Sequence, residues 1–281
     1  MNKDYIQKIV SLALKEDIGR GDITTNALVP KGHRSRARIV LKSRGVICGL
    51  DFARQAFAQL DPKIRFQALV HDGQSVQSSA VIAHVQGPGR ALLMGERVAI
   101  NFLSYLSAIA TKTSDFVGAV KPYKTVILDT RKTTPTLREL ERYAVRCGGG
   151  INHRFDLSQM AMVKDNHRFF MQGQMALEEA INAVQRASKK PVELEVDTLG
   201  QLEQALKTKA DIILLDNMSP AQTRRAVKRR NQLKSMALLE SSGRINLKTV
   251  RQYAATGVDR ISVGELTHSR QVLDISLEFC R

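Results

Sequence analysis

The pattern of apolar and polar positions divides the chain near residue 120. Before that point, residues 4–16 carry apolar side chains at helical spacing, and residues 37–46 alternate apolar and charged side chains as a half-buried strand does. Further strands are predicted at 64–70 and 76–85, and helices at 52–60 and 91–120. This mixture of strands and packed helices predicts a separate α+β layer in the N-terminal part.

After residue 120, short apolar runs alternate with segments of helical spacing, which is typical of a parallel sheet. The predicted strands are 125–128, 160–163, 192–196, 211–215, 237–239 and 260–263. Polar residues follow each run, and the carboxyl ends of parallel strands meet at one edge of a sheet. The sequence therefore predicts an α/β barrel with an active site at its mouth.

Basic residues gather at or near the ends of these runs. They are Arg131, Lys132, His153, Arg154 and Lys164. Fixed charges of one sign raise the local concentration of the other sign, so we interpret the set as a site for a polyanion. The alternative is that they are solvated surface charges, as most lysines and arginines are. Surface charges seldom follow buried strands directly and among glycines, which favours the first interpretation.

The same stretch predicts one helix between two of these basic loops. The helix is expected to hold Pro135 in its first turn, where the missing N–H of proline costs least. The glycines that follow Cys147 are expected to end it.

Acidic residues also end predicted strands. The candidates are Glu195 and Asp216, which end neighbouring predicted strands. Glu193 shares the strand of Glu195 at a period of two, so it faces the same side and is expected in a layer below the mouth. Such carboxylates suit ribose hydroxyls or Mg²⁺. The alternative is local ion pairing with Lys164 or Lys132, because structural ion pairs also cluster charges.

Small residues follow the last two strands. Ser242-Gly243 and Gly264 stand where barrel loops often hold a phosphate with backbone N–H groups. Ordinary strand-to-helix turns are the alternative, since glycine marks turns in every fold.

Composition narrows the classes of function. The chain has 281 residues and a formal charge of +16. It lacks zinc-finger spacing, an aromatic RNA-stacking motif and a basic tail, and its densest basic run, residues 224–230, is interpreted as the polar face of a helix. We therefore expect no nucleic-acid partner.

Targeting signals and cysteine usage predict the compartment. No apolar run reaches the ~18 residues of a membrane span, and the first 22 residues do not have the pattern of a signal peptide. Cys48, Cys147 and Cys280 are odd in number and far apart in the sequence, which fits neither a disulfide framework nor a zinc site. A cytoplasmic protein without a membrane partner is expected.

A set of motifs resembles one enzyme family. The motifs are LDTRKTTP, YAVRCGGG-x-NHR, KDNH, E-x-E-V-D, LLDN, ESSG, TGVD and SVG-x-LTHS, with weaker similarity at ALKEDIGRGDIT. Together they span about residues 97–275 and resemble the quinolinate phosphoribosyltransferases, type II phosphoribosyltransferases also called nicotinate-nucleotide pyrophosphorylases (carboxylating).

The resemblance implies a fold and a reaction. The fold is α/β: an open, TIM-like α/β barrel over residues 111–269 and an N-terminal α/β sandwich domain over residues 1–110, on which the tail 270–281 packs. The reaction transfers phosphoribosyl from phosphoribosyl pyrophosphate to quinolinate with decarboxylation, giving nicotinate mononucleotide, diphosphate and CO₂ in NAD biosynthesis. Mg²⁺ is the implied cofactor, bound through the diphosphate and by Glu195 and Asp216.

The resemblance also assigns residues and a partner. The implied substrate-binding residues are Arg97, Thr130, Arg131, Lys132, His153, Arg154, Lys164, Glu195, Asp216, Ser242, Gly243, Arg244, Gly264, Glu265 and Leu266. Of these, Lys132, Lys164, Glu195 and Asp216 are the expected catalytic residues. A homodimer or hexamer is implied, with Arg97 supplied across the subunit interface.

Three positions depart from the family pattern, and two rival enzymes stay open. Thr136 stands where the family usually has glycine, Ala108 replaces the glycine of LSGIAT, and Arg244 replaces a small or neutral residue. One rival is a related phosphoribosyltransferase for another ring acid, such as nicotinate. The other is an aldolase-like barrel that forms a Schiff base on Lys164, which would require a dry pocket to lower the pKa of the lysine.

Overall fold

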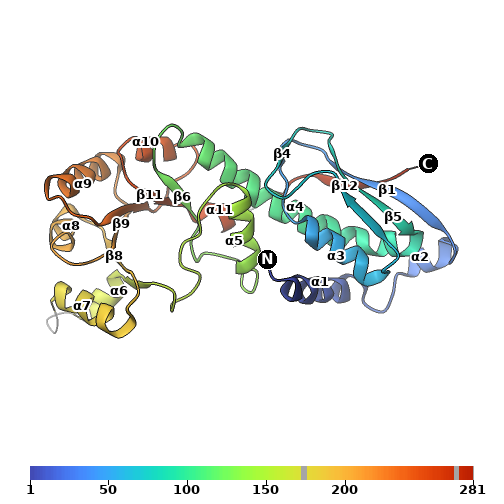
Figure 1. Ribbon diagram of the computed structural model, residues 1–281, viewed down its shortest axis with the longest axis horizontal. Coiled ribbons are helices and arrows are strands. Elements are labelled where there is room, and N and C mark those ends of the chain that lie inside the picture. Colours follow the sequence, from blue (N-terminus) through green and yellow to red (C-terminus); the bar gives the residue numbers. More distant parts are fainter. Residues whose placement is uncertain (172–175, 269–271, 281) are drawn as a thin grey trace. The chain divides into compact units, whose positions relative to one another are not determined.

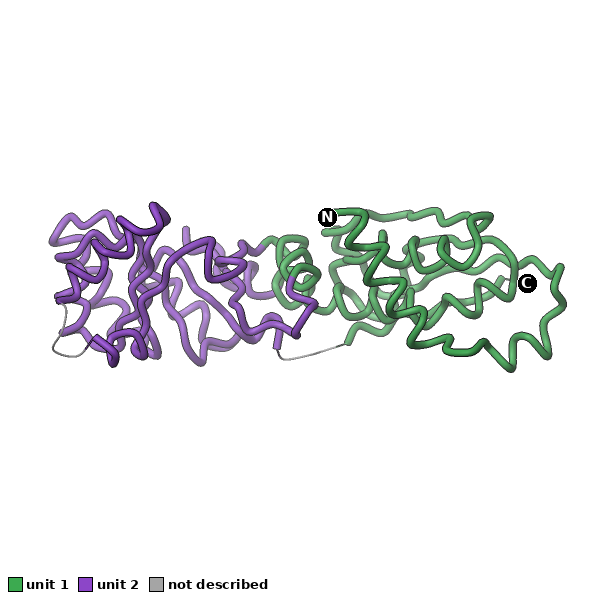
Figure 2. Tube along the Cα trace, turned by 90° about the horizontal axis from the view of Figure 1, so that it is seen from below, with its two compact units in different colours: residues 1–114, 139–149, 269–281 green, residues 115–138, 150–268 purple. Residues whose placement is uncertain are grey.

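A computed structural model describes residues 1–171, 176–268 and 272–280 of the chain. It contains two compact units, coloured separately in Figure 2. Unit 1 holds residues 1–114, 139–149 and 269–281, and unit 2 holds residues 115–138 and 150–268. Residues 139–149 thus belong with unit 1, although the expected barrel domain includes them.

Unit 1 is built on an antiparallel sheet with strand order β12-β1-β5-β3. The strands are β1 (Arg34–Leu41), β3 (Arg65–Ala68), β5 (Val81–Pro88) and β12 (Ile275–Cys280). Ala37, Ile39 and Leu41 point inward from β1 at a period of two, and Ile39 pairs with Ala83 of β5. The C-terminal strand β12 pairs with β1, so the two ends of the sequence share one sheet.

Unit 1 also contains helices and a two-stranded sheet (Figure 1). The helices are α1 (Lys3–Ile18), α2 (Ile23–Leu28), α3 (Leu50–Leu60), α4 (Gly89–Ala119) and α5 (Arg138–Cys147); the short strands are β2 (Gly45–Val46) and β4 (Ser75–Val76). Phe52 of α3 stacks on Phe102 of α4 with ring centroids 5.0 Å apart. Among the described residues, only α4 is long and apolar enough to span a membrane, and 61% of its most apolar window is buried, as in a core helix.

Unit 2 is built on six parallel strands in the order β6-β11-β10-β9-β8-β7. The strands are β6 (Val126–Leu128), β7 (Ala161–Val163), β8 (Val192–Val196), β9 (Ile212–Asp216), β10 (Leu238–Ser242) and β11 (Arg260–Ser262). The helices that connect them are α6 (Asp165–Phe170), α7 (Leu177–Ser188), α8 (Leu199–Ala205), α9 (Pro220–Gln232), α10 (Val250–Ala254) and α11 (Glu265–His268).

The strands of unit 2 are buried, as a parallel sheet covered by helices requires. Leu194, Val196, Ile213 and Leu215 have no exposed surface. In the described residues, β6 and β7 stand at opposite ends of the strand order, so the pairing leaves the sheet open. The predicted α/β class, with a parallel sheet and a separate N-terminal domain, is confirmed.

Two local predictions were wrong. Pro135 is not in the first turn of a helix, because Thr136 adopts a φ of +68° and α5 begins only at Arg138. A residue in this left-handed region cannot continue a right-handed helix. Glu240 and Ser241 were expected after a strand, but both belong to β10 and are buried.

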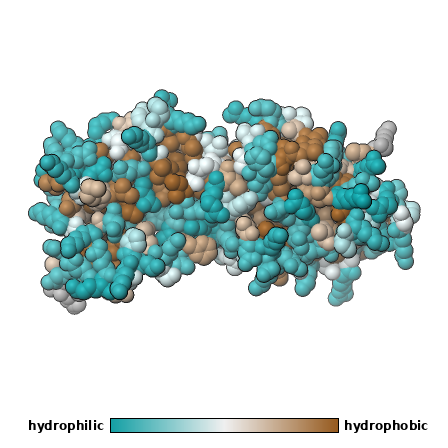
Figure 3. All heavy atoms as spheres, in the orientation of Figure 1, coloured by the Kyte–Doolittle hydropathy of each residue, from teal (hydrophilic) through white to brown (hydrophobic). Residues whose placement is uncertain are grey.

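Both units show a largely hydrophilic surface in Figure 3, with brown apolar patches between the charged residues. Large apolar side chains that are mostly exposed include Ile23, Leu28, Leu157, Phe169, Phe170, Met236 and Val272. Apolar side chains exposed to this extent are candidates for contacts with another protein surface.

Candidate active site

The buried carboxylate of Asp129 links two basic loops of unit 2. Asp129 directly follows β6, and its oxygens accept hydrogen bonds from the Asn152 side chain at 2.6 Å and from the backbone N–H of His153 at 2.7 Å. A buried carboxylate needs such donors, because an ionised group without partners is costly to bury. The loop that carries Thr130, Arg131 and Lys132 therefore lies beside the loop that carries His153 and Arg154.

The backbone of the first loop is held in place at Lys132. Its N–H donates to the Thr130 hydroxyl at 3.1 Å, and its carbonyl accepts from the Thr267 hydroxyl at 2.6 Å. Thr267 is in α11, which follows the last strand of the sheet. The loop after β6 and the helix α11, which lie near the two ends of the unit 2 sequence, are thus joined at Lys132.

Gly264 stands against the Lys132 side chain. A Cβ atom at position 264 would lie 3.2 Å from Lys132 Cδ and 3.2 Å from His268 Nε2. This close approach favours glycine and places His268 beside Lys132. Of the two residues that follow, Leu266 is buried and Glu265 is half-buried. Gly264 is thus the predicted residue of this loop that lies against Lys132.

The ring of His153 is surrounded by protein groups. Its Nε2 lies 3.0 Å from Glu193 Oε2 and 3.4 Å from Glu240 Oε1, and its Nδ1 accepts the backbone N–H of Arg154 at 2.8 Å. Arg260 Nε lies 3.0 Å from the other oxygen of Glu240. His153, Glu193 and Glu240 are all buried. Both ring nitrogens therefore meet protein groups, and His153 fixes the backbone of Arg154.

The surroundings of this cluster shift the pKa values of His153 and Glu193. Burial lowers the pKa of His153, but the hydrogen bonds and charges of Glu193 and Glu240 outweigh it and raise the pKa to about 9. Burial raises the pKa of Glu193, since water no longer solvates its charged form. His153, Glu193 and Glu240 have the donor atoms of a metal site. The guanidinium of Arg260 already supplies a positive charge to Glu240, so a metal ion is not needed to balance it.

Arg154 is buried and directed along β7. Its Nη1 donates to the carbonyl of Met160 at 2.9 Å, and its Nη2 donates to Met162 Sδ at 3.5 Å. Burial, and next the positive charge of Arg131, lower the pKa of Arg154. The exposed Arg131 and the buried Arg154 are thus close enough to repel, and a bound anion would relieve this repulsion.

Lys164 and Glu195 form an ion pair at the ends of β7 and β8. Lys164 Nζ lies 3.6 Å from Glu195 Oε2, and the Glu195 side chain is 15% exposed. Glu193, two residues earlier, is fully buried, so the strand places one carboxylate inside the sheet layer and one at its edge. Local pairing, the alternative considered for these acidic groups, therefore occurs for Glu195.

The ends of β9 and β10 form one continuous edge. Asp216 is the register partner of Ser242, and the Ser242 carbonyl accepts the N–H of Asn217 at 2.9 Å. The Asn217 side chain donates to Asp216 Oδ2 at 2.7 Å. A Cβ atom at Gly243, whose φ is +94°, would lie 2.3 Å from Asn217 Oδ1, so this turn requires glycine.

Two predicted residues stand apart from these contacts. Arg244 is exposed and has a φ of +53°, in the left-handed region. Arg97 is exposed on α4 in unit 1, whereas the other predicted site residues are in unit 2.

The prediction of site residues missed several supporting groups. They are Asp129, Asn152, Glu193, Glu240, Arg260, Thr267 and His268. Some had a visible signal: Asp129 and Asn152 are inside the quoted motifs, and Glu193 shares a strand with Glu195. Arg260 had none, because only the pairing of β10 with β11 brings it to Glu240.

Comparison with known proteins identifies the relatives of this chain. The model of the quinolinate phosphoribosyl transferase C-terminal domain matches residues 109–278, and that of the N-terminal domain matches residues 22–107. The nicotinate-nucleotide pyrophosphorylase [carboxylating] of Mycobacterium leprae is 42% identical over 279 residues, covering 98% of this chain and 97% of that protein.

A plant enzyme and a solved structure agree with this match. Quinolinate phosphoribosyltransferase [decarboxylating] 1b of Nicotiana tabacum is 36% identical over 291 residues, covering 97% of this chain and 82% of that protein. The structure of the nicotinate-nucleotide pyrophosphorylase from Francisella tularensis has a TM-score of 0.92 at 37% identity, covering 100% of this chain and 98% of that one.

Proposed function

Because the chain belongs to the quinolinate phosphoribosyltransferase family, we propose that the carboxyl edge of its six-stranded sheet binds quinolinate and phosphoribosyl pyrophosphate. The enzyme transfers phosphoribosyl to quinolinate with decarboxylation, giving nicotinate mononucleotide, diphosphate and CO₂ in NAD biosynthesis. The observation that carries the location is the Asp129 link, which brings the basic loops after β6 and before β7 to one edge.

Arg131 and Arg154 are proposed to bind the two carboxylates of quinolinate. A guanidinium matches a carboxylate with two parallel hydrogen bonds, and the mutual repulsion of these two groups is relieved by a dianion. His153 supports Arg154 from behind through the contact of its Nδ1 with the Arg154 N–H.

The phosphates are proposed to bind at the carboxyl ends of β10 and β11, the two strands that follow β6 in the strand order. The turn Ser242-Gly243-Arg244 and the start of α11 at Gly264, Glu265 and Leu266 present backbone N–H groups at the carboxyl ends of β10 and β11. Backbone N–H groups in such loops are suited to phosphate oxygens. Lys132, which touches Gly264, can place its ammonium on the same anion.

Glu195 and Asp216 fit Mg²⁺ carried by the diphosphate. They end the adjacent strands β8 and β9, and both are partly exposed, so their oxygens are accessible from the carboxyl edge. Hard carboxylate oxygens are ligands that Mg²⁺ prefers. When bound, Mg²⁺ neutralises charge on the leaving diphosphate.

The side chains of the chain contribute positioning and fixed charge. The arginines orient the pyridine nitrogen toward the anomeric carbon, where the bond to diphosphate breaks through an oxocarbenium-like state. Glu195 and Asp216 stabilise the positive ribose and bind its hydroxyls, while Lys132 and Lys164 face the departing diphosphate. After transfer, the cationic ring nitrogen stabilises the electron pair that stays on C2 as the bond to the carboxylate breaks and CO₂ leaves, and C2 then takes a proton from water.

The assembled form is proposed to be a cytoplasmic homodimer that completes each site with Arg97 of the other subunit. Two features support the dimer: Arg97 is exposed on α4, and large apolar side chains such as Ile23, Leu28 and Phe170 are mostly exposed. A two-fold interface repeats one surface on both chains, so an apolar side chain that lies in it would be covered on both chains.

The test is CO₂ release from quinolinate labelled at the 2-carboxylate. We expect release that requires both phosphoribosyl pyrophosphate and Mg²⁺. Equal turnover of nicotinate would contradict the assignment of Arg131 and Arg154 to two carboxylates. Borohydride trapping of a carbonyl compound on Lys164 would instead favour the Schiff-base alternative.

A further inference from the structure

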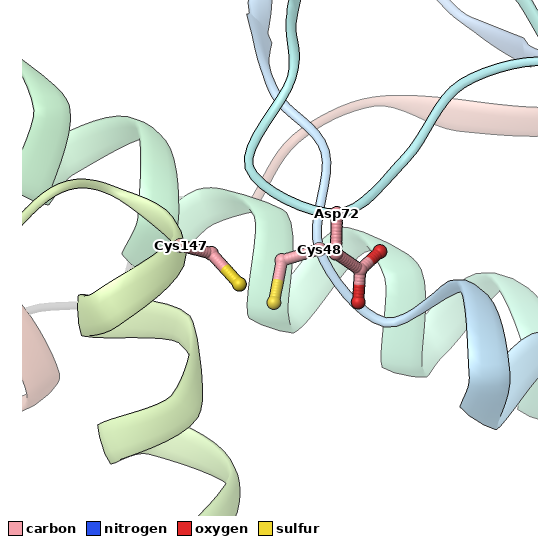
Figure 4. A group of neighbouring side chains, drawn as sticks. All are labelled: Cys48, Asp72 and Cys147. Carbon is pink, nitrogen blue, oxygen red and sulfur yellow. The ribbon is translucent and has the colours of Figure 1, made fainter.

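Two cysteines that are far apart in the sequence meet in unit 1. Cys48 lies between β2 and α3 and is fully buried, whereas Cys147 ends α5 and is partly exposed. Figure 4 shows their sulfur atoms pointing toward one another, with Asp72 beside Cys48. Ligand atoms of all three residues lie within 4.8 Å of one another. Both thiols are free in the structure, and their distance in the sequence gave no sign that they are neighbours in the fold.

Tight packing against α4 fixes both partners. A Cβ atom at Gly148 would lie 2.3 Å from the carbonyl oxygen of Ala110, so the end of α5 rests directly on the backbone of α4. Cys48 donates its N–H to the Ser107 hydroxyl at 2.9 Å, and this hydroxyl lies 3.1 Å from the Cys48 carbonyl. Because one helix holds both segments, the approach of the two sulfurs is built into the fold.

Asp72 has a structural role in this group. Its carboxylate accepts the N–H groups of Gly49 at 3.0 Å and Leu50 at 3.1 Å, and the Tyr143 hydroxyl at 2.8 Å. It thereby caps α3 and ties this helix to α5. A metal ion would have to compete with these three donors for the carboxylate, so the group is better suited to thiol chemistry than to metal binding.

We propose that Cys147 and Cys48 form a reversible disulfide in response to peroxide, with Cys147 oxidised first and Cys48 as the resolving thiol. The partial exposure of Cys147 admits a small oxidant, and the burial of Cys48 keeps it from direct attack. A hydrogen bond with Cys48 lowers the pKa of Cys147, and burial raises the pKa of Cys48. Reactive cysteines of redox sensors have this combination of a low pKa, access and an adjacent resolving thiol.

The chemistry balances with peroxide as the two-electron oxidant. The Cys147 thiolate attacks one peroxide oxygen, the O–O bond breaks, and the departing hydroxide takes a proton to leave as water. Cys48 Sγ then attacks Sγ of the Cys147 sulfenic acid, the S–O bond breaks, and the Cys48 proton leaves with the hydroxide as a second water. Two thiols are oxidised to one disulfide, and one peroxide is reduced to two waters.

The disulfide would constrain the segment of the chain that follows Cys147. From Cys147 the chain continues through the glycine turn to Asn152, His153 and Arg154. A cross-link at Cys147 therefore anchors the start of the segment that carries these residues. The proposal itself does not depend on the enzymatic function, since it is a statement about two thiols of unit 1.

The test uses the full chain with Cys280→Ser, which removes the exposed third thiol. The reduced protein is treated with equimolar hydrogen peroxide, and its free thiols are counted. Peptide mapping without reductant then identifies the linkage. We expect the loss of both thiols, a Cys48 peptide linked to the Cys147 peptide of the same chain, and recovery of both thiols with dithiothreitol.

Matched variants separate the two roles. With Cys48→Ser added, which keeps a hydrogen-bond donor beside Cys147, we expect a sulfenic acid on Cys147 that dimedone traps. With Cys147→Ser added, Cys48 should keep its free thiol. In the parent Cys280→Ser protein, whose pair is intact, a lasting dimedone adduct on Cys147 or two unreacted thiols would overturn the proposal. So would a disulfide found only between chains.

Discussion

The imidazole Nε2 of His153 lies 3.0 Å from Glu193 Oε2, and both side chains are buried in the parallel sheet unit. The opposite ring nitrogen accepts the N–H of Arg154. His153 therefore contacts the buried carboxylate of Glu193 through one ring nitrogen and the backbone of Arg154 through the other. A polar group buried this deeply is retained only with partners, and here these partners set the orientation of the ring.

The first prediction concerns the titration of His153. The carboxylates of Glu193 and Glu240 raise its folded pKa from 6.5 to about 9, so the stability that protonation contributes is complete below pH 6.5 and is lost as the pH rises through about 9. The Arg154 N–H, which Nδ1 accepts only when it is unprotonated, acts against this shift. Replacing Glu193 by Gln removes one negative charge and should lower this pKa by about 1 unit or more. NMR of the imidazole nitrogens measures the titration, with Glu178→Gln on the exposed face of α7 as control.

Two outcomes would contradict this prediction. One is a wild-type pKa near 6.5, which would mean that the N–H of Arg154 keeps Nδ1 unprotonated against both carboxylates. The other is a pKa that Glu193→Gln does not move, which would assign the effect to Glu240.

The second prediction concerns backbone strain at Thr136. Its φ of +68° is a conformation that costs a β-branched residue about 1–2 kcal/mol, whereas glycine loses about 0.5–1 kcal/mol of extra chain entropy on folding. Thr136→Gly should therefore raise the free energy of unfolding by about 0.5–1 kcal/mol. Urea unfolding measures the change.

Thr134→Gly is the matched control, because Thr134 is outside the set of residues with positive φ in the described chain. Glycine there gains no relief of strain and should lower stability. Equal losses at both positions would show that the contacts of Thr136 outweigh its strain.

The third prediction concerns the guanidinium of Arg154. Its two terminal nitrogens contact Met160 and Met162 separately, and an ammonium cannot reproduce this two-point geometry. Arg154→Ala should lower kcat/KM for quinolinate by an amount that corresponds to a loss of about 2–5 kcal/mol of transition-state stabilisation. Arg154→Lys should lose less than Ala but still a substantial part. Near-full activity of the lysine variant, compared with exposed Arg225→Lys, would contradict this explanation.

The fourth prediction tests the dimer with two inactive variants. Arg97→Ala and Lys132→Ala homodimers should each be nearly inactive. If Arg97 acts in the other subunit, a mixed dimer has one site with both lesions and one intact site. With random exchange, half of the dimers are mixed, so activity should recover to about a quarter of wild type. The assay follows co-expression with different tags, and tagged mixed dimers without activity would place Arg97 outside the partner's site.

Much of the sheet could be predicted from local pattern alone. Short β-branched and leucine-rich runs between polar residues located the six parallel strands within one or two residues, except that β10 extends to Ser242. A buried strand needs a continuous apolar run, and this requirement is visible in the sequence without any partner. The motifs that follow these strands also sufficed to recognise the family.

Contacts between distant segments were decided by the tertiary structure. Glu240 became a buried partner of His153 because β10 lies two strands from β8, and Arg260 joined it through β11. Cys48 meets Cys147 because α4 supports both segments. The sequence by itself determined which segments are strands and which residue types follow them, since these depend on local hydrophobicity. Only the folded chain decided which charges and thiols are neighbours, because strand order and helix packing set those distances.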